Sequence, residues 1–79
     1  MDLEDNLKNE IDKWTTKIET EMKGVKVVEE ENENFLTNIN AYISDSKHFK
    51  EKGDLVRSFE AIVWAWSWLE ILRELKIIT

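Results

Sequence analysis

His48 is the only imidazole among the 79 residues, and it is the first side chain to consider for chemistry. Asp45 lies three positions before it and Glu51 three positions after it, so a helix would bring both carboxylates beside the ring. Such a group could form half of a metal or acid–base site. A protein metal site needs three or four ligands, and the chain has no cysteine and no second histidine. We therefore favour a surface or boundary histidine over a functional one.

The other charged side chains with regular spacing indicate exposed helix faces. Glu60, Glu70 and Glu74 recur at near-helical spacing, and a di-metal bundle would also need Glu-x-x-His motifs, which the sequence lacks. Arg57 lies three residues after Asp54 and three before Glu60, so an exposed ion pair is favoured over an anion-binding role. We predict no catalytic residue, no metal site, no cofactor and no enzymatic activity.

The three tryptophans Trp64, Trp66 and Trp68 could stack on bases or sugars. Nucleic acids and anionic membranes, however, attract proteins with a positive surface. The net charge here is −6, and residues 1–34 contain eleven Asp or Glu against five Lys. We therefore expect no nucleic acid partner, and a core or interface role for the tryptophans.

Three features of the sequence bear on where the protein is located in the cell. No run of about 18 apolar residues exists, so we expect no membrane-spanning segment. Residues 1–5 are acidic and lack an apolar stretch, so we expect no signal peptide. The absence of cysteine is compatible with a reducing compartment, and we predict a cytoplasmic protein.

The elements that must position these side chains are helices. The chain has no proline and only two glycines, so residues that break helices are almost absent. Apolar side chains at steps of three and four residues predict helices near 2–22, 28–51 and 54–77. We predict an all-α protein, a three-helix up-and-down bundle formed by a single domain of residues 1–79. The apolar seams of the first two helices are Leu3, Leu7, Ile11, Trp14, Ile18 and Met22, and then Phe35, Leu36, Ile39, Tyr42, Ile43, Ser46 and Phe49.

The helix ends are predicted from the glycines and their neighbours. Gly24 follows the first helix, where a left-handed residue could end it, and Gly53 can do the same for the second. Asp54 then suits the N-cap of the third helix, which makes the second and third helices antiparallel neighbours. The segment 25–28 is Val-Lys-Val-Val, but we expect it to turn the chain, because a single strand has nothing to pair with.

The third helix is apolar around more of its circumference than a bundle requires. One stripe contains Leu55, Phe59, Ile62, Trp66 and Leu69. A second stripe, roughly opposite at 100° per residue, contains Trp64, Trp68, Ile71 and Leu75. Two neighbouring helices with narrow seams cannot cover both stripes. We expect part of the second stripe to stay exposed in a monomer or to be covered by another molecule.

A family resemblance adds to this interpretation. The pattern Tyr42-x-x-Asp45-x-x-x-Phe49-x-x-Lys52-Gly53-Asp54, followed by Ala61, Ala65 and Trp68-Leu69-Glu70, resembles the archaeal family called domain of unknown function 357. The similarity covers about 45 of the 79 residues, with Ser46 and Ser58 where Ala is usual in the family. It implies an up-and-down helical bundle and an archaeal origin. It implies no activity.

Two functional hypotheses follow from the second stripe. The first is a protein-interaction or self-assembly module, with Trp64, Trp68, Ile71 and Leu75 as interface candidates. Its partner would be a second copy in a two-fold dimer, or another protein. The alternative is a small-ligand-binding bundle with an aromatic pocket near Trp64 and Trp68.

Overall fold

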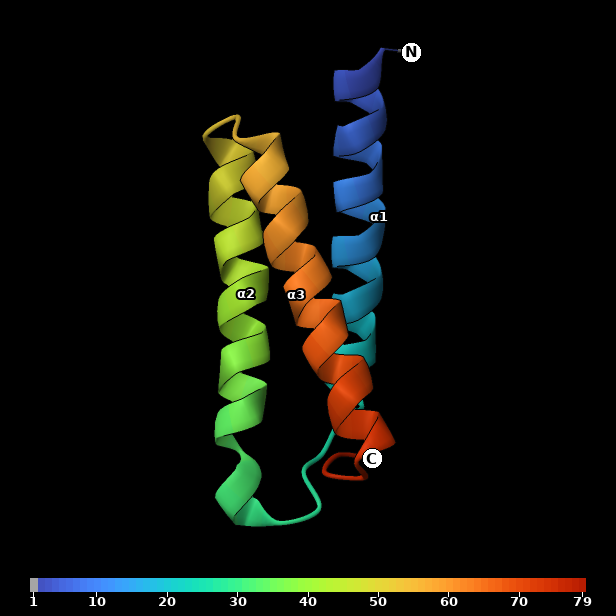
Figure 1. Ribbon diagram of the computed structural model, residues 1–79, viewed down its shortest axis with the longest axis vertical. Coiled ribbons are helices and arrows are strands. Elements are labelled where there is room, and N and C mark those ends of the chain that lie inside the picture. Colours follow the sequence, from blue (N-terminus) through green and yellow to red (C-terminus); the bar gives the residue numbers. More distant parts are fainter. Residues whose placement is uncertain (1) are drawn as a thin grey trace.

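The computed structural model describes residues 2–79, and Figure 1 shows its arrangement. Within this range the chain forms the α-helices α1 (Leu3–Lys23), α2 (Asn34–Glu51) and α3 (Leu55–Glu74), with a short 3-10 helix, η1 (Glu30–Asn32), before α2. The helices run down, up and down, so α1 and α3 are parallel and α2 is antiparallel to both. The predicted all-α, three-helix up-and-down bundle is confirmed.

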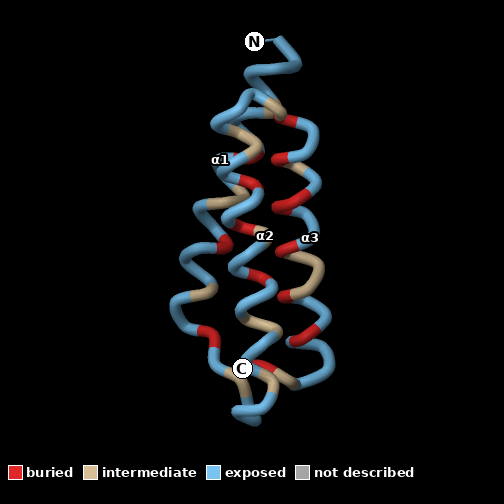
Figure 2. The backbone as a smooth tube through the Cα atoms, turned by 90° about the vertical axis from the view of Figure 1, so that its left-hand side faces the viewer, coloured by how far each residue is buried: buried red, intermediate tan, exposed pale blue. Residues whose placement is uncertain are grey.

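The core follows the predicted seams. Buried residues lie along the facing sides of the three helices (Figure 2). The side chains with almost no exposure include Ile11 and Ile18 from α1, Ile39 from α2, and Ile62, Leu69 and Leu72 from α3. Each set repeats at steps of three, four or seven residues, so a single side of each helix is removed from water.

Two buried serines join α2 and α3. Ser46 and Ser58 are completely buried. The Ser46 hydroxyl donates to the backbone carbonyl of Ser58 at 2.8 Å, and the Ser58 hydroxyl donates to that of Ser46 at 2.7 Å. Small side chains let the two backbones approach, and the reciprocal bonds satisfy both buried hydroxyls.

Helix α1 is held mainly against α3. The rings of Trp14 and Trp66 meet edge to face with centroids 5.7 Å apart, and the Trp66 indole N–H donates to the Trp14 carbonyl at 3.1 Å. Ion pairs connect α1 to both neighbours: Lys47–Glu19 at 2.9 Å, Arg73–Glu21 at 2.6 Å, and Lys50–Asp12. Three of the eleven Lys and Arg side chains therefore form exposed ion pairs between helices.

The turn between α2 and α3 has the predicted geometry. Gly53 has φ +81°, in the left-handed region. Its N–H donates to the Lys50 carbonyl at 3.0 Å, and the Asp54 N–H donates to the Phe49 carbonyl at 2.9 Å. These two bonds form a Schellman motif. The Asp54 carboxylate accepts from the Arg57 N–H at 3.1 Å, so Asp54 is the N-cap of α3.

Two predictions about the α1–α2 connection were wrong. Gly24 has φ −100°, and α1 ends through i→i+3 bonds to Glu21 and Met22 instead of a left-handed residue. The second helix begins at Asn34 and not at residue 28. Glu29 is extended, and a helix from residue 28 would have placed it one turn from Glu33, where like charges repel.

The segment 25–28 does have a pairing partner, contrary to our expectation. Val27 and Ile78 form an isolated antiparallel bridge. The Val28 N–H donates to the Ile77 carbonyl, and the Thr79 N–H donates to the Lys26 carbonyl, both at 2.9 Å. Helix α3 ends at Glu74, before the predicted residue 77. The residues after it pair with the segment 25–28 at the lower end of the bundle instead of continuing the helix.

Candidate protein-interaction surface on helix α3

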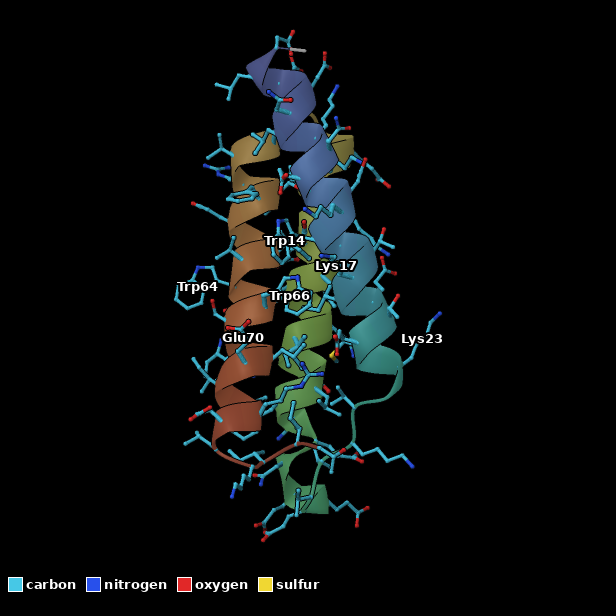
Figure 3. All side chains as sticks on the ribbon, turned by 90° about the vertical axis from the view of Figure 1, so that its right-hand side faces the viewer. Trp14, Lys17, Lys23, Trp64, Trp66 and Glu70 are labelled. Carbon is cyan, nitrogen blue, oxygen red and sulfur yellow. The ribbon has the colours of Figure 1, made fainter. Side chains whose placement is uncertain are left out.

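The tryptophans of α3 point to different sides of the bundle. Trp66 faces α1, where its ring meets that of Trp14. Trp64 and Trp68 are each two residues away, which is about 160° around a helix. In Figure 3, Trp64 accordingly points out of the bundle, on the side of α3 away from the Trp14–Trp66 contact. The first predicted stripe is thus in the core, and the second lies on another side of α3.

Most of the second stripe is exposed. The exposed fractions are 56% for Trp64, 48% for Ile71 and 63% for Leu75, whereas Trp68 is half-buried. We call these four residues the α3 face. Our expectation that part of this stripe would remain exposed in the isolated chain is thus met. Its role as an interface stays a prediction.

Aromatic side chains of α2 hold the two tryptophans of the α3 face. Trp64 stacks on Tyr42 with centroids 6.4 Å apart and an interplanar angle of 20°. Trp68 stacks on Phe35 at 6.1 Å and 30°. Stacking of this kind stabilises a defined ring orientation. The two indoles therefore form part of a surface that spans α2 and α3.

A groove of about 380 Å³ lies between α2 and α3 beside Trp68. Its lining consists of Asn38, Ala41, Tyr42, Asp45 and Trp68. Of the two tryptophans near which an aromatic pocket was predicted, Trp68 is part of this lining and Trp64 is not. The groove is walled by Tyr42 and Trp68 and carries one carboxylate.

This groove lies on the side of α2 that faces away from α1. Lys47 and Lys50 face α1, because they pair with Glu19 and Asp12. Asp45 is two residues before Lys47, which at 100° per residue places it about 160° around the helix. The groove and the α3 face are therefore both clear of α1.

Negative charge surrounds the α3 face. Glu60 lies one turn before Trp64, Glu74 lies one turn after Ile71, and Asp45 lines the groove with Trp68. Among the residues that the structure describes, these three carboxylates take part in no ion pair. They remain available to a cation from outside the chain.

Arg57 and Lys76 carry positive charge at the two ends of this face. Arg57, at the upper end, pairs with Asp54 at 3.6 Å, as the sequence predicted. Lys76 follows Leu75 at the lower end. The middle of the face, from Trp64 to Ile71, therefore combines apolar side chains with the unpaired Asp45 carboxylate of the neighbouring groove.

The remaining candidates for chemistry do not converge. His48 is exposed in the last turn of α2, with its ring 6.1 Å from that of Phe49. Glu70 is exposed and lines a second groove, next to Trp14 and Trp66. In the described range 2–79, no three His, Cys, Asp or Glu side chains are grouped so that they could hold a metal ion.

Sequence reasoning missed the part of the surface that α2 contributes. Apart from their place in the family motif, Asp45 was considered as a neighbour of His48 and Tyr42 as a seam residue. Their spacing of three residues, at the edge of the apolar seam, was the available signal. The position of Trp68 against α2 could not be read from α3 alone.

Comparison with known proteins agrees with this fold. The model of the family described as "Protein of unknown function (DUF357)" matches residues 4–78. The chain belongs to this family. The crystal structure of the DUF357 protein AF1782 from Archaeoglobus fulgidus is similar, with 49% sequence identity and a TM-score of 0.90. The match covers 99% of this chain and 97% of that one.

No curated protein matches the chain. In the part of the chain that the structure describes, no helix has the length and apolar character needed to cross a membrane. The resemblance to DUF357 drawn from the α2–α3 motif is confirmed, and Tyr42, Asp45 and Trp68 of that motif line one groove.

Proposed function

We propose that this DUF357 protein is a protein-interaction or self-assembly module that acts through the α3 face. The observation that carries the proposal is the exposure of Trp64, Ile71 and Leu75 on one side of a single helix. Single exposed apolar residues are ordinary on protein surfaces, whereas a contiguous group rimmed by charge is typical of an interaction site.

Covering this face would contribute several kcal/mol to association before costs are subtracted. Tryptophan contributes up to about 250 Å² of surface, and 56% of Trp64 is exposed. Burying that part at about 25 cal/mol per Å² gives roughly 3 kcal/mol. Ile71 and Leu75 add to this, and the cost of association is subtracted from the total. The stacked indoles lose little further freedom on binding, which favours an interface.

A second copy is the simplest way to cover the face, because a two-fold axis lets the same patch cover itself. Sedimentation equilibrium at high micromolar concentration tests this form of the proposal. A dimer that Ile71→Glu dissociates, and that Val63→Glu leaves intact, would support self-assembly. Val63 is the matched control because it is 44% exposed on the same helix but about 80° away from Ile71.

A strictly monomeric wild-type protein would exclude self-assembly and leave another protein as the partner. A dimer that Val63→Glu dissociates as readily as Ile71→Glu would place the interface elsewhere and contradict the role of the α3 face.

We also propose that the protein works in the cytoplasm as a single domain of residues 1–79. The absence of cysteine supports the first point. Fractionation of cells that produce the protein, with antibody detection, tests it: recovery in an extracytoplasmic fraction would contradict the proposal.

A further inference from the structure

The groove beside Trp68 has the chemistry of a site for a positively charged side chain. Tyr42 and Trp68 line it together with the Asp45 carboxylate. Aromatic rings attract Lys and Arg through their negative faces, Trp most strongly. A carboxylate next to such rings adds a charge-assisted hydrogen bond. Asp45 is exposed and takes part in no ion pair among the described residues.

The side chains around the groove indicate the kind of partner segment to which this Lys or Arg would belong. Trp64, Ile71 and Leu75 recur at steps of seven and four residues. They form a straight apolar row about 17 Å long at 1.5 Å per residue. Glu60 lies one turn before Trp64, and Glu74 lies directly before Leu75, about 100° around the helix from it. An apolar row with acidic groups around it complements an amphipathic helix whose apolar side chains are flanked by Lys or Arg.

Charge argues against a second copy in this position. The chain has a net charge of −6, and a two-fold contact through the α3 face would bring Asp45, Glu60 and Glu74 of both copies together. Like charges across an interface select against a partner. Of the cations on α3 and directly after it, Arg57 is paired with Asp54, Arg73 is paired with Glu21, and Lys76 lies at the lower end of the face. Among the described residues, no Lys or Arg lines the groove.

We propose that the α3 face binds a cationic amphipathic helix of another protein, with a Lys or Arg side chain in the groove against Asp45, Tyr42 and Trp68. This inference rests on the proposed function and specifies its partner. The helix would pack along α2 and α3 on the side opposite α1, as the fourth helix of a bundle.

Three synthetic peptides of about four helical turns test the proposal. All carry leucines along one face. The residues flanking that face are Lys in the first peptide, Gln in the second and Glu in the third. Binding is followed by isothermal titration calorimetry at low and high salt. We expect the Lys peptide to bind most tightly, the Glu peptide most weakly, and the difference to shrink as salt rises.

Two variants locate the cation. Asp45→Asn should weaken binding of the Lys peptide about fivefold, the upper end of the effect of a solvent-exposed ion pair. Glu51→Gln is the control, because Glu51 is also an exposed residue of α2 without an ion pair in the described chain. It changes the net charge equally and should alter binding less than twofold. Asp45 is exposed, so its replacement by Asn should leave the fold intact.

The outcomes separate the two proposals. Equal binding of all three peptides, or equal effects of the two variants, would overturn the cationic partner but retain the apolar interface. The wild-type protein could also form a dimer that Ile71→Glu dissociates and fail to bind the Lys peptide. That result would likewise overturn the cationic partner and retain the apolar interface. If no peptide binds and the wild-type protein is monomeric, both the cationic partner and the proposed function fail.

Discussion

Replacing Gly53 with alanine should lower the free energy of unfolding by about 1 kcal/mol. Gly53 has φ +81°, and an added Cβ would meet nothing within 4 Å, so the change introduces backbone strain without a clash. A left-handed conformation costs a non-glycine residue about 1–2 kcal/mol. The lower entropy of the unfolded chain returns about 0.4–1 kcal/mol. The difference leaves a net loss near 1 kcal/mol.

The end of α3 offers the opposite experiment. Lys76 has φ +60°, its N–H donates to the Arg73 carbonyl at 3.0 Å, and the Ile77 N–H donates to the Leu72 carbonyl at 2.9 Å. This is the same Schellman motif with lysine where glycine is preferred. Lys76→Gly should therefore stabilise the protein. We expect about 0.5 kcal/mol, because the loss of a cation at the helix C-terminus offsets part of the gain.

Gly24 is the control for both changes. Its φ is −100°, and an added Cβ would lie 4.0 Å from the nearest atom, the Glu21 carbonyl oxygen. Gly24→Ala should be stabilising by about 0.4–1 kcal/mol. Urea unfolding followed by circular dichroism measures all three variants, and 1 kcal/mol corresponds to about 4–8 °C in melting temperature at this size. If Gly53→Ala and Gly24→Ala changed stability equally, the conformational argument would be refuted.

Two further predictions concern the contact of α2 with α3. Asp54→Ala should cost about 1 kcal/mol through loss of the N-cap, and an unchanged urea midpoint would contradict the capping role. Ser46→Ala and Ser58→Ala should each cost about 1 kcal/mol. Their effects should not simply add, because the two hydroxyls also lie 3.1 Å from each other, and a double variant whose loss equals the sum of the single losses would refute this.

The local chemistry of the sequence was sufficient to predict the helices and the α2–α3 turn. Gly53 and Asp54 act within a few residues of themselves, so their roles could be read from their neighbours. The seam residues also repeat at helical spacing, and this repeat places Ile18, Ile39 and Ile62 in the core.

The α1–α2 connection could not be predicted in this way, because its conformation depends on residues distant in the sequence. Val27 pairs with Ile78, fifty-one positions later, and no local pattern marks that partner. The candidate surface likewise has one part that the local sequence predicted and one part that depends on residues distant in the sequence. The excess of apolar residues on α3 indicated that part of its second stripe would stay exposed or be covered by another molecule, whereas the groove arises only when α2 places Asp45 beside Trp68.

Site-specific photo-crosslinking tests the role of the α3 face most directly. A photoreactive phenylalanine analogue is placed at residue 64 or 71 of the face, or at the control positions 56 and 63. Val56 and Val63 are also exposed on α3, at 67% and 44%. After irradiation of cells that produce the protein, the variants with the analogue at position 64 or 71 should form a covalent adduct of one defined mass with the partner. The variants with the analogue at position 56 or 63 should form no such adduct. No adduct from these two positions, or the same adducts from the control positions, would contradict an interaction surface at the α3 face.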